Sequence, residues 1–138
     1  MRPRVLFSGG NMKSKLWLPM ALALWPLTAD ASTIKQQLQK LDPEERAHQV
    51  CVMKGIDTIR NQGKLPKADR LKTSITKPAK FTGTQVAAPG GAVRAKSHWY
   101  TLKFKCEVTP DQMTAVSFTY EIGPEIPEAN WEDLGLWR

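Results

Sequence analysis

The apolar run from Leu16 to Leu27 most constrains this chain, because it decides how many residues remain to build a domain. Lys13 and Lys15 precede the run, and Ala29-Asp30-Ala31 follows it with small residues at its first and third positions. Basic residues, a short apolar segment and an Ala-x-Ala site together predict a cleavable secretory signal over residues 1–31.

Cleavage of this signal is predicted between Ala31 and Ser32. The run spans twelve residues and contains two prolines, whereas a membrane-spanning helix needs about 20 apolar residues. An uncleaved anchor or a buried helix is the alternative interpretation. Met12 is an alternative start, because a compact basic segment follows it directly. We therefore expect export to the periplasm by the general secretory route, with no transmembrane span after cleavage.

The 107 residues that remain predict a polar arm over residues 32–40 and a single domain over residues 41–138. Both cysteines, Cys51 and Cys106, lie in this part, and two cysteines in an exported protein usually form a disulfide. A metal site would need about four ligands at close spacing, and a redox pair usually has the C-x-x-C spacing, which is absent. We expect a structural disulfide, no metal and no cofactor.

The mature chain is basic in its body and acidic toward its C-terminus. The full chain carries a net charge of +7, and residues 32–138 carry +4. Residues 32–105 hold 15 basic and 5 acidic side chains, whereas residues 106–138 hold 1 basic and 7 acidic. The imbalance fits an anionic partner in the envelope, such as a lipid, an acidic glycan or a protein. It equally fits two regions that face each other or are solvated, since no basic run reaches five residues.

A strong helix start stands at Asp42-Pro43-Glu44-Glu45, where Asp42 can cap and Pro43 suits the first helical position. Helical spacing of apolar residues continues to about Gln62, and Gly63 is a natural stop. Gly55 inside this helix costs up to about 1 kcal/mol, which close packing can offset. The sequence predicts one main helix, with the polar segment before it forming a short extra helix or a frayed arm.

From Asp69 onward the apolar pattern alternates, as in half-buried strands. Strands are expected over residues 71–75, 81–87, 92–109 and 116–122, with Pro89-Gly90-Gly91 as a tight turn and a bend near Ser97-His98. Pairing of Cys106 with Val116 would set the register of the last two strands. A short helical turn over residues 127–134 would bring the C-terminal apolar residues back over the sheet. The predicted fold is α+β, with one main helix on an antiparallel sheet of about four strands and a short C-terminal helix.

The alternating pattern separates two strand faces and suggests a binding face. The candidate binding residues are His98, Trp99, Lys103 and Lys105. An aromatic beside lysines could stack nucleic acid, but export and the presence of a single Trp on this face argue against nucleic acid. A glycan or a protein fits this face better. Alternatively, the C-terminal segment covers Trp99.

Catalysis needs a nucleophile, a base and a group that orients the base. His98 is the best candidate base, but Glu107 and Asp111 lie about 20 Å or more away along an extended strand. His48 is expected to be exposed on the helix, and either histidine could have a purely structural or solvated role. The chain has no nucleophile elbow, Walker loop or H-E-x-x-H motif. No catalytic residue is assigned.

Several motifs in consistent order resemble the bacterial domain-of-unknown-function family 930. They are Leu41-Asp42-Pro43-Glu44-Glu45-Arg46, Gln49-Val50-Cys51, Asp69-Arg70, Ala88-Pro89-Gly90-Gly91-Ala92, Trp99-Tyr100-x-Leu102-x-Phe104-x-Cys106, Val108-Thr109-Pro110-Asp111 and Ile122-Gly123-x-Glu125-Ile126-Pro127-Glu128-x-x-Trp131. The resemblance spans residues 41–137 and departs at Val52, where the family has an acidic residue, and over residues 72–80. It implies an alphaproteobacterial envelope protein, brings no activity, and places both cysteines in its strongest motifs.

Three functions follow from these observations. The first is a non-enzymatic periplasmic module that binds an envelope component or a protein. The second is a small hydrolase or lyase acting on cell-wall or glycan substrates, with His98 and an acid brought near by folding. The third is an inhibitor or immunity-type protein that uses its acidic C-terminal segment as the blocking element.

Overall fold

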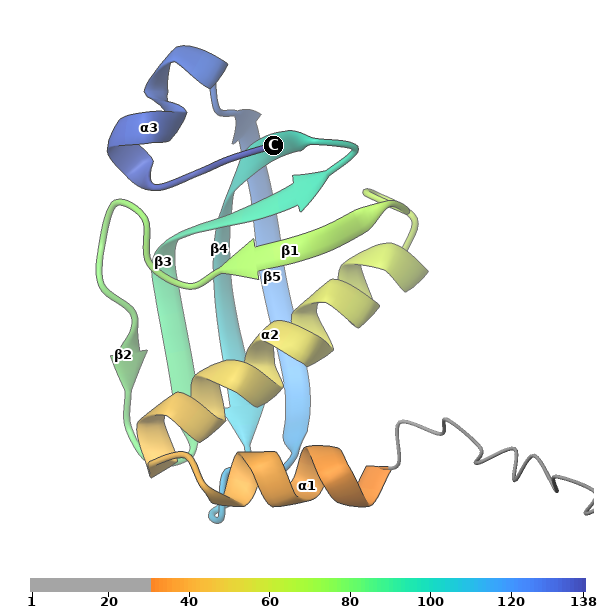
Figure 1. The fold of residues 1–138 in the computed structure, drawn as a ribbon, viewed down its shortest axis with the longest axis vertical. Helices are drawn as coiled ribbons and strands as arrows, with labels where there is room; N and C mark the ends of the chain where they lie inside the picture. Colours follow the sequence, from red (N-terminus) through yellow and green to blue (C-terminus); the bar gives the residue numbers. More distant parts are fainter. Residues whose placement is uncertain (1–30) are drawn as a thin grey trace, which may run out of the picture.

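A computed structural model describes residues 31–138 of the chain. The signal predicted over residues 1–31 therefore lies outside the described residues, apart from Ala31, which begins the first helix. One long helix lies across one face of an antiparallel sheet, and a short C-terminal helix sits at one end of that sheet (Figure 1). This arrangement confirms the predicted α+β fold, with a sheet of five strands.

The helices are α1, α2 and α3, with a 3₁₀ turn η1 directly before α3. Their bounds are Ala31–Gln39 for α1, Pro43–Asn61 for α2, Glu128–Asn130 for η1 and Trp131–Leu134 for α3. The strands are Ala68–Lys72 for β1, Lys80–Phe81 for β2, Gln85–Ala95 for β3, His98–Val108 for β4 and Ala115–Glu125 for β5. The polar segment that was expected to form a helix or an arm is thus the helix α1.

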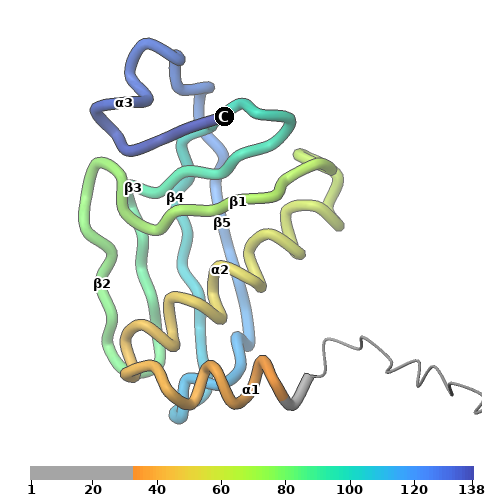
Figure 2. The backbone as a smooth tube through the Cα atoms, in the orientation of Figure 1, coloured from red at the N-terminus to blue at the C-terminus, as the bar shows by residue number. Residues whose placement is uncertain are grey.

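The sheet has the order β1-β3-β4-β5, and β2 pairs with β3 on the same side as β1. Figure 2 traces the backbone from α2 into β1, along a loop to β2 and then into β3. β1 pairs with residues 92–95 of β3, and β2 pairs with residues 86–87. Two short strands therefore share one edge, whereas β5 alone forms the other.

Local sequence signals set the ends of α2. The Asp42 side chain accepts a hydrogen bond from the Glu45 amide at 3.0 Å and caps the helix, and Pro43 is its first residue. Gly63 follows the C-cap with φ of 78°, a left-handed conformation that glycine adopts without strain. Both predicted boundaries of this helix are confirmed to within about a residue.

The first core lies between α2 and the sheet. The buried helix residues Ala47, Val50, Cys51 and Ile59 pack over β3, β4 and β5. Gly55 is also buried, and a Cβ atom there would lie 2.6 Å from Cζ of Phe118. The helix glycine thus permits a close approach to the sheet, as predicted.

The prediction of one extended strand over residues 92–109 is wrong. The chain reverses at Lys96 and Ser97, so that Ala95 ends β3 opposite His98 at the start of β4. Lys96 and Ser97 both have left-handed backbone conformations, with φ of 52° and 62°, as a tight two-residue hairpin turn requires. The alternation of apolar and polar residues changes phase at this point because the chain turns back in a hairpin rather than bending.

The prediction of a turn at Pro89-Gly90-Gly91 is also wrong, because these residues lie inside β3 at a bulge. A Cβ atom on Gly90 would lie 2.5 Å from the Lys77 nitrogen, and one on Gly91 would lie 2.6 Å from the Lys72 oxygen. Gly90 therefore permits a close approach of the loop before β2, and Gly91 a close approach of the end of β1. The strand predicted over residues 81–87 is divided by the turn between β2 and β3.

The register of β4 and β5 differs by two residues from the prediction. Cys106 pairs with Phe118 rather than with Val116, and Phe104 pairs with Tyr120. A bulge where β4 ends leaves Val116 without a partner on β4, and 63% of its surface is exposed. Val116 is therefore not an inward residue.

The C-terminal segment builds a second core on the opposite side of the sheet. Trp131 and Leu136 are buried there together with Ile126, Trp99 and Ala92. The Trp131 indole donates to the Ile126 carbonyl at 2.9 Å. The predicted return of this segment over the sheet is confirmed, although Trp137 stays half exposed.

Candidate functional site

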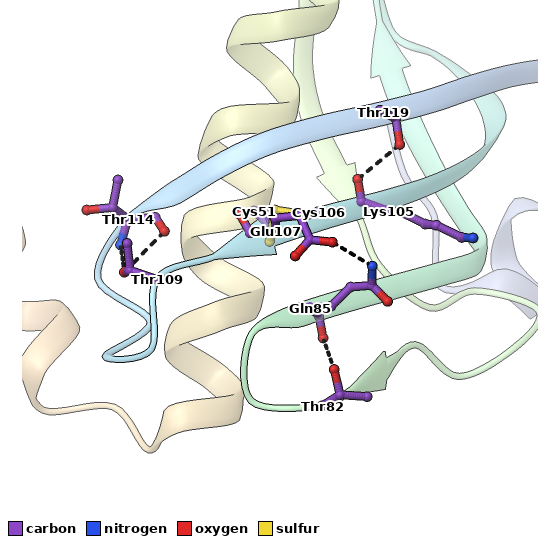
Figure 3. The surroundings of a disulfide bond; sticks show 9 residues. All are labelled: Cys51, Thr82, Gln85, Lys105, Cys106, Glu107, Thr109, Thr114 and Thr119. Carbon is purple, nitrogen blue, oxygen red and sulfur yellow. Dashed lines mark hydrogen bonds between the residues drawn. A yellow bond between two sulfur atoms is a disulfide. The ribbon is translucent and has the colours of Figure 1, made fainter.

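The two cysteines form a disulfide that joins α2 to β4. Cys51 and Cys106 are both fully buried, with their Cα atoms 6.0 Å apart. Figure 3 shows the bond between the helix and the strand, near Gln85 and Glu107, whose side chains hydrogen bond at 2.7 Å. Because Cys106 faces α2, its neighbour Lys105 must point to the opposite side of the sheet.

The predicted binding residues divide between the two faces of the sheet. Trp99, Lys103 and Lys105 alternate along β4 on the face opposite α2, which we call the open face. His98 precedes Trp99 directly in β4, so its side chain lies on the opposite face, on the helix side, near Tyr100. The structure therefore brings the two lysines together but separates His98 from them.

Trp99 belongs to the open face but is not accessible there. The C-terminal segment covers it completely, and its indole donates to the Trp137 carbonyl at 2.6 Å. The Trp137 ring packs edge-on against it, with centroids 5.7 Å apart. Of the two interpretations of Trp99, coverage by the C-terminal segment is the one observed.

The part of the open face that the C-terminal segment leaves free is hollowed by a groove of about 610 Å³. We call it the lysine groove, and its principal lining residues are Lys80, Ala87, Pro89, Lys103, Lys105, Thr119 and Glu121. The lysines come from β2 and β4, while the floor consists of the small or flat side chains Ala87 and Pro89. All three lysines are exposed.

A second hollow of about 340 Å³ continues the lysine groove toward the loop before β2. It shares Pro89, Lys103 and Glu121 with the lysine groove and adds Lys77 from that loop. Four lysines and one carboxylate thus line a path across the open face. The positive charge predicts attraction of an anionic ligand that is extended rather than compact.

His98 has a carboxylate partner that the sequence did not suggest. Its Nδ1 lies 2.9 Å from Oε1 of Glu125, at the far end of β5, and both side chains are more than half exposed. A hollow of about 250 Å³ beside His98 is also lined by Lys64, Lys67 and Lys96. The pair could exchange a proton with a bound molecule.

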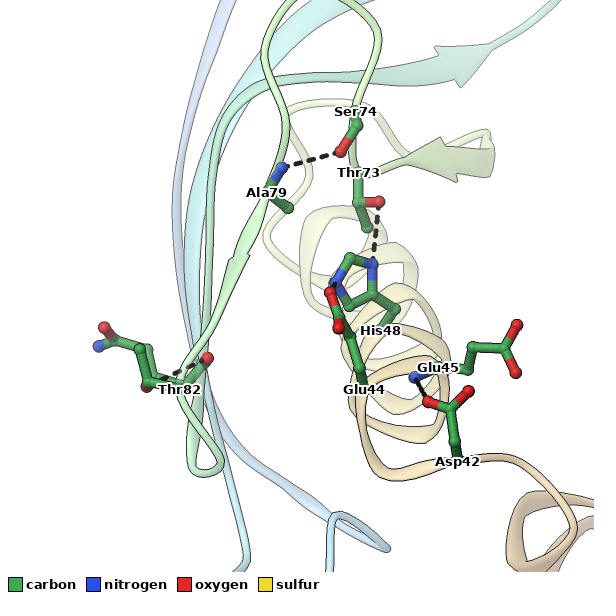
Figure 4. A network of polar contacts seen from close by, with 9 residues as sticks. Asp42, Glu44, Glu45, His48, Thr73, Ser74, Ala79 and Thr82 are labelled. Atoms are coloured by element: carbon green, nitrogen blue, oxygen red, sulfur yellow. Dashed lines mark hydrogen bonds and ion pairs between the residues drawn. The ribbon is translucent and has the colours of Figure 1, made fainter.

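His48 is largely buried rather than exposed, with 25% of its side chain accessible. Figure 4 shows it between Thr73 and Glu44. Its Nδ1 lies 3.2 Å from the Thr73 hydroxyl, and its Nε2 lies 4.0 Å from Oε1 of Glu44. Nε2 has no hydrogen-bond partner among the described residues. The Thr73 contact holds α2 against the segment after β1, and sequence spacing could not reveal it because the two residues are 25 positions apart.

Asp69 and Asp111, which belong to two of the motifs shared with family 930, make structural hydrogen bonds. Asp69 accepts two hydrogen bonds from Arg94, at 2.9 Å and 2.7 Å, and Arg94 lies beneath the Trp99 ring. The Arg94 hydrogen bond holds the pKa of the Asp69 carboxyl below its ordinary value. A hydrogen bond from Thr109 lowers the pKa of Asp111 in the same way, in the turn before β5.

A family model described as Domain of Unknown Function (DUF930) matches residues 38–136. The chain belongs to this family. The match confirms the resemblance carried by the motifs around both cysteines and by the C-terminal Trp131 motif. No curated protein and no solved structure matches the chain.

In this DUF930 domain the described residues contain no group of three or more side chains that could hold a metal ion. Within residues 31–138, no helix is long and apolar enough to cross a membrane. The lysine groove and the His98–Glu125 pair are two places where the described surface offers chemistry to a ligand.

Proposed function

We propose that this DUF930 domain is an exported, non-enzymatic binding module whose lysine groove takes an extended anionic ligand of the cell envelope, such as an acidic glycan. The single observation that carries the proposal is the path of four lysines with one carboxylate across the open face. The disulfide and the apolar run at residues 16–27 support export.

The shape of the groove suits a chain of sugar rings. Ala87 and Pro89 give a low apolar floor on which a ring face can lie, while lysines stand around it. Glu121 is paired with Lys103 across β4 and β5 and adds a hydrogen-bond acceptor to the groove lining. Exposed lysines attract acidic groups mainly through long-range electrostatic attraction, which salt screens. The affinity for the ligand should therefore fall as the salt concentration rises.

The test uses protein purified after expression of the full chain, with a polyuronate oligosaccharide as the probe. We expect binding by calorimetry, and a loss of at least tenfold in affinity for Lys103→Glu and for Lys105→Glu. Lys54→Glu is the matched control, because Lys54 is exposed on α2, outside both hollows of the path. An uncharged oligosaccharide of equal length should not bind.

Equal losses for the groove variants and for Lys54→Glu would show a general charge effect and would refute a site at the groove. Binding of vesicles of anionic lipid, but not of the oligosaccharide, would replace the glycan with a membrane surface as the ligand.

A second candidate function rests on the His98–Glu125 pair, which could serve a small hydrolase or lyase. The electrostatic interactions of a catalytic pair become stronger when water is excluded from the site. Both of these side chains are more than half exposed. Hydrolysis of a cell-wall or glycan substrate that is abolished by His98→Ala and kept by Lys103→Glu would favour this enzyme. Unchanged turnover in His98→Ala would remove it.

The inhibitor hypothesis assigns blocking to the acidic C-terminal segment. Its apolar residues Trp131 and Leu136 are engaged by the domain's own sheet, while Glu132 and Asp133 are exposed. Glu125, Glu128 and Trp137 are exposed as well, so several side chains of the segment are free to contact a target. A variant with Glu132→Lys and Asp133→Lys that keeps inhibiting a captured enzyme would exclude these two carboxylates as the blocking contacts.

A further inference from the structure

The two edges of the sheet differ in how they are protected against pairing with another strand. On one edge β1 has five residues and β2 has two, and the exposed side chains Asp69, Arg70 and Lys80 carry charge. Short, charged strands resist edge-to-edge pairing. β5 forms the other edge with eleven residues.

β5 lacks these protections over its first six residues, whereas Glu121, Gly123, Pro124 and Glu125 lie in its last five. Residues 115–120 contain no charged residue, proline or glycine. Its only strand partner among the described residues is β4. Val116 stands at its start with 63% of its surface exposed, the most exposed of the large apolar side chains described. Unpaired backbone groups on such an edge favour pairing with a further strand.

The pattern of side chains on β5 is complementary to itself. Two copies related by a twofold axis perpendicular to the sheet keep the same face on the same side, so residues of equal parity must pair. A register centred on Thr119 places Phe118 opposite Tyr120 of the second copy and Ser117 opposite Glu121. This register puts aromatic against aromatic on the helix side and brings no like charges together.

We propose that β5 pairs antiparallel with β5 of a second copy of this chain, in a register centred on Thr119, to form a continuous ten-stranded sheet. The lysine grooves of both copies then lie on one face of that sheet. The homodimer does not depend on the proposed ligand, because its contacts come from the backbone edge and from the aromatic residues of β5.

The test compares oligomeric state and cross-linking in protein purified after expression of the full chain. Analytical ultracentrifugation should show a concentration-dependent dimer. Thr119→Lys places two like charges directly opposite each other at the axis, and we expect it to raise the dimer dissociation constant at least tenfold. Thr84→Lys is the control, since Thr84 is exposed in the turn between β2 and β3, near the other edge.

Thr119→Cys should give a covalent dimer with a short thiol cross-linker, because directly opposed Cβ atoms lie about 5 Å apart. Thr84→Cys should not. A wild-type chain that stays monomeric up to about millimolar concentration overturns the proposal and would leave the edge to a strand of a different protein. A dimer that survives Thr119→Lys, or that cross-links equally through residue 84, also overturns it.

Discussion

Gly55 shows how the absence of a side chain lets the main helix lie close to the sheet. A Cβ atom at this position would lie 2.6 Å from Phe118 and 2.8 Å from Leu71. Gly55→Ala gains about 1 kcal/mol of helix propensity but overpacks the core, which costs about 1 to 3 kcal/mol. We expect no gain and typically a loss of about 1 kcal/mol in the free energy of unfolding, measured with urea.

Asp57→Ala is the control for Gly55→Ala, because Asp57 is exposed on the same helix. It should change the free energy of unfolding by less than about 0.5 kcal/mol. A stabilised Gly55→Ala protein would contradict the close packing described for this position.

Asp69 predicts a pH dependence of stability. Its pKa in the folded chain lies below the ordinary value, mainly because Arg94 donates to it. A lowered folded pKa stabilises the fold above the unfolded pKa of about 3.9, and this contribution disappears as the pH falls through the lower folded value. Asp69→Asn should therefore be less stable than wild type at pH 7, and the difference should shrink toward about pH 2.

Urea unfolding of both proteins at the two pH values measures this effect. Asp57→Asn controls for the loss of an exposed carboxylate, since Asp57 has no ion pair among the described residues. A deficit for Asp69→Asn that is equal at both pH values would show that packing around Arg94, rather than charge, is responsible.

The C-terminal segment acts as a structural element that closes the open face over Trp99. Lys72 also holds it, by donating to the Gly135 carbonyl at 2.7 Å. Trp131→Ala truncates one of the two buried tryptophans of the second core. We expect a loss of about 3 to 5 kcal/mol in the free energy of unfolding. The exposed Trp137→Ala should cost less, and an equal cost for both would contradict the second core.

Elements with local signals could be predicted from the sequence, and elements set by distant contacts could not. The cap at Asp42 and the stop at Gly63 act within a few residues, so α2 was predicted closely. The turn at Lys96-Ser97 carries no glycine or asparagine, so nothing in its sequence predicts left-handed residues. Gly90 and Gly91 indicate a turn, but Gly90 permits contact with the loop before β2 and Gly91 permits contact with the end of β1.

The same limit applies to the site. Alternation along β4 placed Lys103 and Lys105 on one face, because that pattern is local. Lys77 and Lys80 join them only through pairing of β2 with β3. Alternation alone could not show that the C-terminal segment covers Trp99, because the contact with Trp137 joins residues 38 positions apart.

For the whole molecule, the predicted signal decides where the folded chain begins. If residues 1–31 are removed on export, the mature protein begins at Ser32. Intact mass measurement of protein from the periplasmic fraction of an expression host should give the mass of residues 32–138 with the disulfide formed. A full-length mass in the membrane fraction would support the uncleaved anchor instead.

In the proposed function, an anionic chain lies in the lysine groove on the open face. NMR tests this through the amide chemical shifts of the oxidised protein during titration with the polyuronate oligosaccharide. The largest changes are expected at Lys80, Ala87, Lys103, Lys105 and Glu121, which line the groove. Changes centred on His98 and Glu125 instead, or none at saturating oligosaccharide, would contradict the claim.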